Sequence, residues 1–112
     1  MKNIFLFIIL STLSANVLSQ DIFNYLETKN YNQLEVSLNE GKSTEIYNEK
    51  GLTPLWLSVF KNDTIALNLL LKYNVDINFT EKKGMHPIMI GCLANSYESV
   101  QILLKNGVDV NW

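Results

Sequence analysis

The sequence repeats itself with a fixed spacing of 33 residues. Residues 51–59, GLTPLWLSV, return at 84–92 as GMHPIMIGC, and residues 74–78, NVDIN, return at 107–111 as GVDVN. A constant period in this range indicates a solenoid of stacked units, in which each unit packs only on its neighbours. The 112-residue chain has room for one small domain of this kind.

Each unit is expected to hold two helices. Thr53 can cap a helix that begins at Pro54, where a missing N–H costs nothing, and this short helix is mostly apolar through Phe60. Asn62 suits a left-handed turn, and Asp63 can cap a second helix that is apolar on most sides. Such a helix must be packed on two flanks, as in the middle of a stack.

Turn residues mark the ends of the units. Gly41, Asn74 and Gly107 follow the expected second helices, where a left-handed residue commonly ends a helix. The stretch 76–84 is polar and turn-rich, which predicts a projecting hairpin. The predicted fold is all-α: a solenoid of helix–turn–helix units joined by β-hairpin-like loops.

These residues resemble the ankyrin repeat, whose unit opens with Gly-x-Thr-Pro-Leu-His-x-Ala and closes with Gly-x-Asp-Val-Asn. The first copy has Trp56 for His and Ser58 for Ala, and the second has His86 for Thr and Met89 for His. The family's His joins neighbouring repeats by hydrogen bonds. We therefore expect Trp56 and Met89 to replace those bonds with packing, which makes the interface between repeats more apolar.

The resemblance also extends toward the N-terminus. Residues 21–41 are similar to the family's N-terminal capping repeat, because they lack the Thr-Pro opening and carry more polar residues on the second helix. The resemblance implies an ankyrin-repeat domain at 20–112. It would contain a capping repeat at about 21–49 and repeats at about 50–82 and 83–112.

The first 20 residues have the pattern of a secretory leader. Lys2 supplies a positive charge, residues 4–10 are apolar without interruption, and Val17 and Ser19 stand at −3 and −1 of a cut before Gln20. We expect a cleavable signal peptide at 1–19 and an exported domain, periplasmic or secreted, with no membrane attachment after cleavage. An uncleaved membrane anchor is the alternative.

Composition argues against several classes of function. The net charge is −2, there is no Arg, and removal of Lys2 with the leader leaves 8 Lys against 11 acids, a charge of −3. Nucleic-acid binding is therefore not expected. His86 and Cys92 are the only residues of their kinds, and six residues along one helix place them on opposite faces. We predict no enzyme, no cofactor and no metal site, and expect Cys92 to be buried.

The resemblance implies that a protein partner binds along the hairpin tips and the inner face of the first helices. Phe79 is the best single anchor, because aromatic residues dominate binding hot spots, and packing on the neighbouring hairpin is its alternative role. Carried over by position, the candidate contacts are Tyr47, Asn48, Glu49, Lys50, Trp56, Phe79, Thr80, Glu81, Lys82, Lys83 and Trp112.

The C-terminal end of the stack is expected to be incompletely covered. The last predicted helix, about 97–105, mixes apolar residues with polar ones, and Ser99 and Gln101 are expected to form part of a makeshift cap. A partner or a second copy covering this end, or a truncated gene, are the alternatives.

The predicted function is non-catalytic protein–protein binding outside the cytoplasm. An inhibitory, immunity or protective role is an interpretation of location and fold. Self-association through the C-terminal repeat and a membrane-anchored ankyrin module are the other hypotheses.

Overall fold

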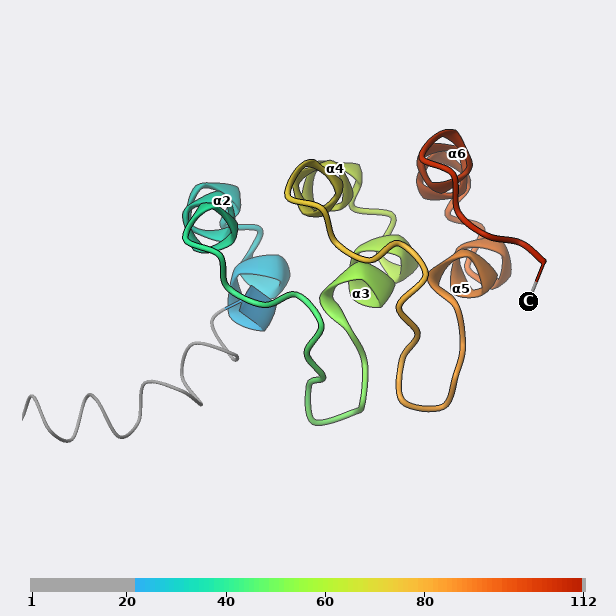
Figure 1. Ribbon diagram of the computed structural model, residues 1–112, viewed down its shortest axis with the longest axis horizontal. Coiled ribbons are helices and arrows are strands. Elements are labelled where there is room, and N and C mark those ends of the chain that lie inside the picture. The colour runs from blue at the N-terminus through green and yellow to red at the C-terminus, as the bar shows by residue number, and fades with distance from the viewer. Residues whose placement is uncertain (1–21, 112) are drawn as a thin grey trace, which may run out of the picture.

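The computed structural model describes residues 22–111, which form a row of three helix pairs (Figure 1). No β-strand occurs in this range, so the predicted all-α repeat fold is confirmed. The predicted signal peptide at 1–19 and the candidate residue Trp112 lie outside the described residues. The pairs are residues 22–28 with α2 (Tyr31–Asn39), α3 (Pro54–Phe60) with α4 (Thr64–Lys72), and α5 (Pro87–Leu93) with α6 (Tyr97–Lys105).

The predicted caps hold the helices of the second pair. Thr53 Oγ1 accepts a hydrogen bond from the Trp56 N–H at 3.1 Å, at the start of α3. Asp63 Oδ1 accepts one from the Ala66 N–H, also at 3.1 Å, at the start of α4. Both bonds satisfy backbone donors that the first turn of a helix leaves without a partner.

Left-handed residues turn the chain where the sequence predicts them. Asn62 has φ +51° between α3 and α4, and Asn74 has φ +63° after α4. Gly41 and Gly107 have φ +83° and +78° at the corresponding places in the other units. Because each unit ends in the same turn, successive helix pairs leave in the same direction and stack.

The core lies between two rows of helices. The helices α2, α4 and α6 form an outer row, and residues 22–28, α3 and α5 form an inner row from whose side the hairpins project (Figure 1). Leucines of the outer row are buried between them, with Leu34, Leu67 and Leu70 fully inaccessible to solvent. These repeated positions make one continuous core along the stack.

The third helix pair packs closely on the second. Gly91 in α5 lies so near its neighbours that an added Cβ would stand 2.8 Å from Val100 Cγ2 and 2.9 Å from Val59 Cγ1. The position is occupied by Ser58 in the second unit, where the Oγ donates to the Pro54 carbonyl at 2.9 Å. Close packing of α5 against α3 and α6 therefore requires a residue without a side chain.

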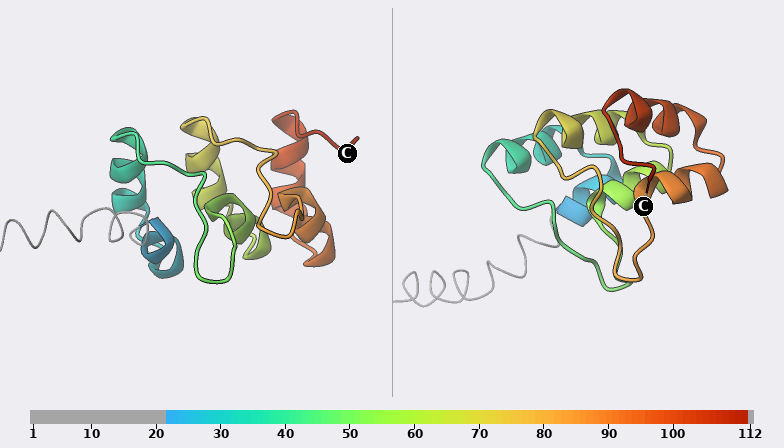
Figure 2. Two further views of the ribbon diagram at one scale, coloured as in Figure 1. Left: turned by 60° about the horizontal axis from the view of Figure 1, so that its bottom comes forward. Right: turned by 45° about the vertical axis from the view of Figure 1, so that its right-hand side comes forward.

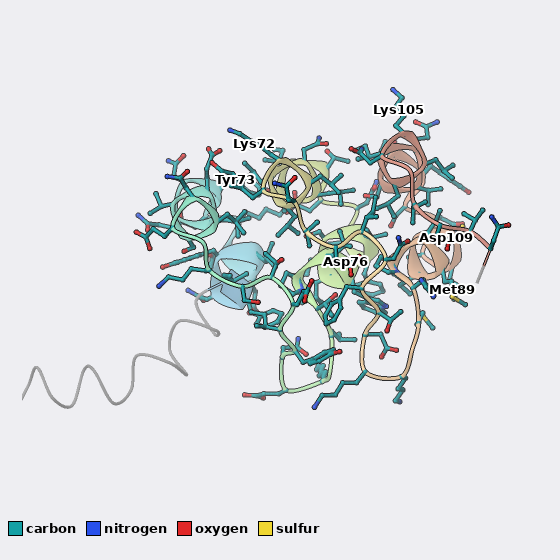
Figure 3. The ribbon with its side chains drawn as sticks, viewed as in Figure 1. Lys72, Tyr73, Asp76, Met89, Lys105 and Asp109 are labelled. Carbon is teal, nitrogen blue, oxygen red and sulfur yellow. The ribbon has the colours of Figure 1, made fainter. Side chains whose placement is uncertain are left out.

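Hydrogen bonds between side chains join the first and second units on the outer row. Glu35 Oε2 lies 2.8 Å from Lys72 Nζ and accepts a bond from the Tyr73 hydroxyl at 3.0 Å. Figure 3 shows Lys72 and Tyr73 on the side of α4 that faces α2. The bond from Lys72 holds the pKa of Glu35 below its ordinary 4.5. The outer row thus carries an exposed polar link across the first interface.

Asn62 joins the second and third units. Its Oδ1 accepts bonds from the Ser99 N–H at 3.1 Å and the Ser99 hydroxyl at 2.8 Å, and its Nδ2 donates to Glu98 at 2.7 Å. The repeats are therefore joined by polar bonds in addition to packing, at positions other than Trp56 and Met89. Ser99 is fully buried and turned toward the second unit, so it does not cap the C-terminal end as predicted.

Among residues 22–111, no helix is both long enough and apolar enough to cross a membrane.

Candidate functional site

The hairpins and the inner helices lie on the same side of the stack (Figure 2). A groove opens on this side between the first hairpin and the first two inner helices. Its volume is about 1080 Å³, and it is bounded by residues 22–28, the first hairpin and α3. Four of its lining side chains are aromatic, and two acidic and two basic residues are also present. The aromatic ones are Phe23, Tyr47, Trp56 and Phe60, and the charged ones are Glu27, Glu49, Lys50 and Lys61.

The 33-residue period aligns apolar side chains along this side. Phe23, Trp56 and Met89 occupy one position of the inner helices, and Phe60 and Leu93 occupy the position one turn later in the second and third. We call these five residues the inner strip. Figure 3 shows Met89 on the side of α5 toward which the hairpins project.

Much of the inner strip is open to solvent. Phe60 is 48% exposed, Met89 36% and Leu93 71%. The rings of Trp56 and Phe60 stack with centroids 5.4 Å apart and planes 20° apart. A row of apolar side chains at the surface, one from each helix pair, is a feature that packing of the domain itself does not require.

The two hairpins contact each other. The Tyr47 and Phe79 rings lie with centroids 5.5 Å apart, and Lys82 Nζ lies 5.4 Å from the centre of the Tyr47 ring. The Lys82 N–H donates to the Gly51 carbonyl at 2.9 Å. Phe79 therefore has the alternative role given above, packing on the neighbouring hairpin. The partly exposed Tyr47 is the more accessible aromatic of the pair.

Two of the predicted contact residues have structural roles inside the hairpins. Asn48 Oδ1 accepts bonds from the Lys50 and Leu52 N–H groups, each at 2.9 Å. Glu81 is only 6% exposed, and its Oε1 accepts a bond from the Met85 N–H at 2.8 Å. The Glu81 side chain is therefore unavailable to a partner, which corrects the prediction that placed it in the contact set.

The remaining hairpin candidates differ in exposure. Glu49, Lys50, Lys82 and Lys83 are exposed at the hairpin tips, whereas Thr80 is half-buried. Glu49 and Lys50 also line the groove, whereas Lys82 and Lys83 do not.

Phe23 and Phe60 were not predicted as site residues. A signal was present, because Phe23 precedes Trp56 by one period and Phe60 follows Trp56 by one helical turn. Applying the 33-residue period to Trp56 would have found Phe23, and applying the helical repeat to Trp56 would have found Phe60.

Cys92 is exposed, so the expectation that it is buried was wrong. The equivalent residue of the second unit, Val59, is fully buried beneath the third unit. No group of three or more His, Cys, Asp or Glu side chains in residues 22–111 is arranged to hold a metal ion.

Some apolar residues of the third unit are exposed, although the equivalent residues of the second unit are half-buried. Leu104 is 54% exposed and Val110 53%, whereas their equivalents Leu71 and Ile77 are half-buried. Cys92, Leu104 and Val110 form what we call the end face.

Two comparisons with known proteins bear on this arrangement. A family model described as ankyrin repeats, in three copies, matches residues 21–111. No curated protein matches the chain.

Proposed function

Because the chain belongs to the ankyrin-repeat family, whose members are protein–protein interaction modules, we propose that it is a non-catalytic module that holds one protein partner on its grooved side. The hairpins and the inner helices form this side, and the inner strip supplies its apolar contacts.

The exposure of the inner strip carries the proposal. A soluble domain gains nothing from leaving Phe60 and Leu93 in water, and exposed apolar patches rimmed by polar groups commonly mark interaction sites. The groove has charged residues of both signs around an aromatic floor, which is the usual composition of a binding surface.

The location proposed for this activity is outside the cytoplasm. The leader pattern at 1–19 supports export, and in the periplasm or outside the cell a module of this kind could inhibit, neutralise or protect a single partner. The intact mass of the chain after export tests this. A product that begins at Gln20 supports it, and a full-length product favours a membrane-anchored module.

Recovery of a partner by matched variants tests the binding side. Phe60→Ala removes the most exposed aromatic of the inner strip, and Ile65→Ala removes a similarly exposed apolar residue on α4, in the outer row. A tagged chain expressed in its native host should recover one stoichiometric protein by cross-linking. That protein should be lost with Phe60→Ala and kept with Ile65→Ala, while both variants keep the thermal unfolding curve of the wild type. Equal recovery by the two variants would exclude the grooved side.

Self-association is a second candidate, favoured by the end face. Leu104 and Val110 expose apolar surface that a second copy could cover. Light scattering should then show an oligomer that Leu104→Lys converts to a monomer. A wild-type chain that remains monomeric at high concentration would exclude this alternative.

A further inference from the structure

We propose that Asn106 is a site of covalent modification, at which the side-chain amide becomes a carboxylate when the segment 107–111 comes away from the second unit. Asn106 and Gly107 form the one Asn-Gly pair of the sequence. Both residues are exposed, at the point where α6 ends. Neither residue lines the groove, so the reaction does not depend on what the grooved side binds.

The reaction needs only the chain itself and water. The backbone nitrogen of Gly107 attacks Cγ of Asn106, its proton leaves with the side-chain nitrogen as ammonia, and a cyclic imide remains. Water then opens the imide at either of its two carbonyl groups. One product is aspartate, and the other is isoaspartate, in which the backbone runs through Cγ of the former side chain. Glycine favours the attack because it has no Cβ beside the nucleophilic nitrogen.

The folded conformation of Asn106 holds the two reacting atoms apart. Its backbone has φ −96° and ψ 13°, which turns Cβ and the Gly107 nitrogen away from each other about the Cα–C bond. Its Nδ2 donates to the Ile102 carbonyl at 2.7 Å, and the Gly107 N–H donates to the Leu104 carbonyl at 3.3 Å. Both bonds must break, and ψ must change, before the imide can form.

The residues after Asn106 are anchored, so its backbone cannot turn alone. After α6 the chain turns back toward α5 (Figure 1). Val108 is buried, and its N–H donates to the Leu103 carbonyl at 3.2 Å. The Asp109 N–H donates to Asn78 Oδ1 of the second unit at 3.0 Å. A change of ψ at Asn106 moves this whole segment, so its release from Asn78 controls the rate of the reaction.

Asn95 is the strictest comparison within the chain. It is exposed, and the small residue Ser96 follows it. Ser96 is buried, however, and its N–H donates to the Gly91 carbonyl at 2.8 Å. The nitrogen that would attack Asn95 is therefore held inside the fold, whereas Gly107 is exposed and makes a longer bond. We expect Asn106 to react first.

The modification weakens the end of α6. A carboxylate cannot donate to the Ile102 carbonyl as the Asn106 amide does, and a negative charge is unfavourable beside the carbonyl groups of a helix C-terminus. Isoaspartate also lengthens the backbone, so the bonds that Gly107 and Val108 make to the last turn cannot all be kept. A modified chain would therefore have a looser third unit.

Incubation of the purified chain at mildly alkaline pH tests the proposal. Peptide mapping by mass spectrometry measures the conversion of amide to acid at each asparagine, and labelling by an isoaspartyl methyltransferase identifies isoaspartate. A synthetic peptide of residues 103–109 gives the rate without the fold. Gly107→Asn is the matched control for the chemistry, because it copies Asn74 of the second unit and so keeps a residue that tolerates the left-handed turn.

Conversion should occur at Asn106 before any other asparagine, more slowly than in the peptide, and should be lost in Gly107→Asn. Asn78→Ala removes the acceptor of the Asp109 N–H and should speed conversion roughly two- to tenfold, the effect of one hydrogen bond. Tyr31→Phe removes a bond to Asp63 across the first interface instead, and should leave the rate at Asn106 unchanged.

Four outcomes would overturn the proposal. Earlier conversion at Asn95, or no conversion at Asn106 while the peptide converts completely, would remove the site. Equal rates in the chain and the peptide would show that the fold does not control the reaction. Equal rates in the wild type and Asn78→Ala would show that release from the second unit is not the step that permits it.

Discussion

Replacing Gly91 by Ala should destabilise the domain, although alanine is the better helix former. Gly91 lies inside α5 with an ordinary helical backbone, and exchanging a mid-helix glycine for alanine alone stabilises by about 0.5–1 kcal/mol. Against this, the added Cβ would stand 2.8 Å from Val100 Cγ2 and 2.9 Å from Val59 Cγ1. Both separations are too short for carbon atoms, so at least one helix must move.

The neighbours of Gly91 decide the sign of the effect. Val59 and Val100 are β-branched residues in helices, where one rotamer of valine is strongly preferred, so neither methyl can easily turn away. Overpacking of this kind costs about 1–3 kcal/mol. Subtracting the gain in helix propensity leaves an expected net loss of about 1 kcal/mol at the middle of both ranges, and at most about 2.5 kcal/mol.

Urea-induced unfolding, followed by circular dichroism, measures this loss. A lower midpoint with an unchanged slope reports lower stability without a change in the surface exposed on unfolding. The control is a double-mutant cycle with Val100→Ala, which removes the nearer methyl, so that Gly91→Ala should cost less on that background. If Gly91→Ala raised the midpoint in the wild-type background, the close approach of α5 would not be the constraint described above.

Three further predictions concern the core and the interfaces between repeats. Leu70→Ala empties a fully buried site and should cost about 2–5 kcal/mol in the same urea assay, so a variant with wild-type stability would contradict the repeat register. Asn62→Gly keeps the left-handed turn but removes the bonds to Glu98 and Ser99, and should lower the free energy of unfolding by about 1–2 kcal/mol. An unchanged free energy of unfolding would mean that those bonds do not stabilise the fold. Because the bond from Lys72 lowers the pKa of Glu35, the link stabilises the fold above the ordinary pKa of 4.5 and is lost as pH falls through the lowered value. Melting temperatures of wild type and Glu35→Gln should therefore converge in acid, and a constant difference at all pH values would contradict this assignment.

The fold could be predicted from the sequence because its main determinants are local. Thr53 and Asp63 cap their helices through bonds to residues three positions away, and Asn62 and Asn74 have the backbone conformation that their residue type tolerates. The left-handed turns repeat with the same period, so a single register accounts for the whole stack. The caps do not, because His86 and Ser96, the equivalents of Thr53 and Asp63, make no side-chain cap bond.

The site was less predictable because it depends on what covers each residue. Phe60 belongs to a short, mostly apolar helix, and the pattern of such a helix does not tell the covered side from the open one. Glu81 is charged and lies in a hairpin, yet its carboxylate turns inward to the Met85 N–H. Cys92 has the same place in its unit as the buried Val59, and the difference arises from the neighbouring unit alone.

The end face also determines which unit of the stack opens most readily. In a linear array of repeats, the stability of a unit is the sum of its own contribution and the contributions of its interfaces. Among residues 22–111, the second unit has two such interfaces, whereas the third has one. Backbone amides of α6 should therefore exchange with solvent faster than those of α4, through local openings that leave the rest folded. A partner that contacts Met89 and Leu93 would slow this exchange, so binding on the grooved side would also set how long the third unit stays closed.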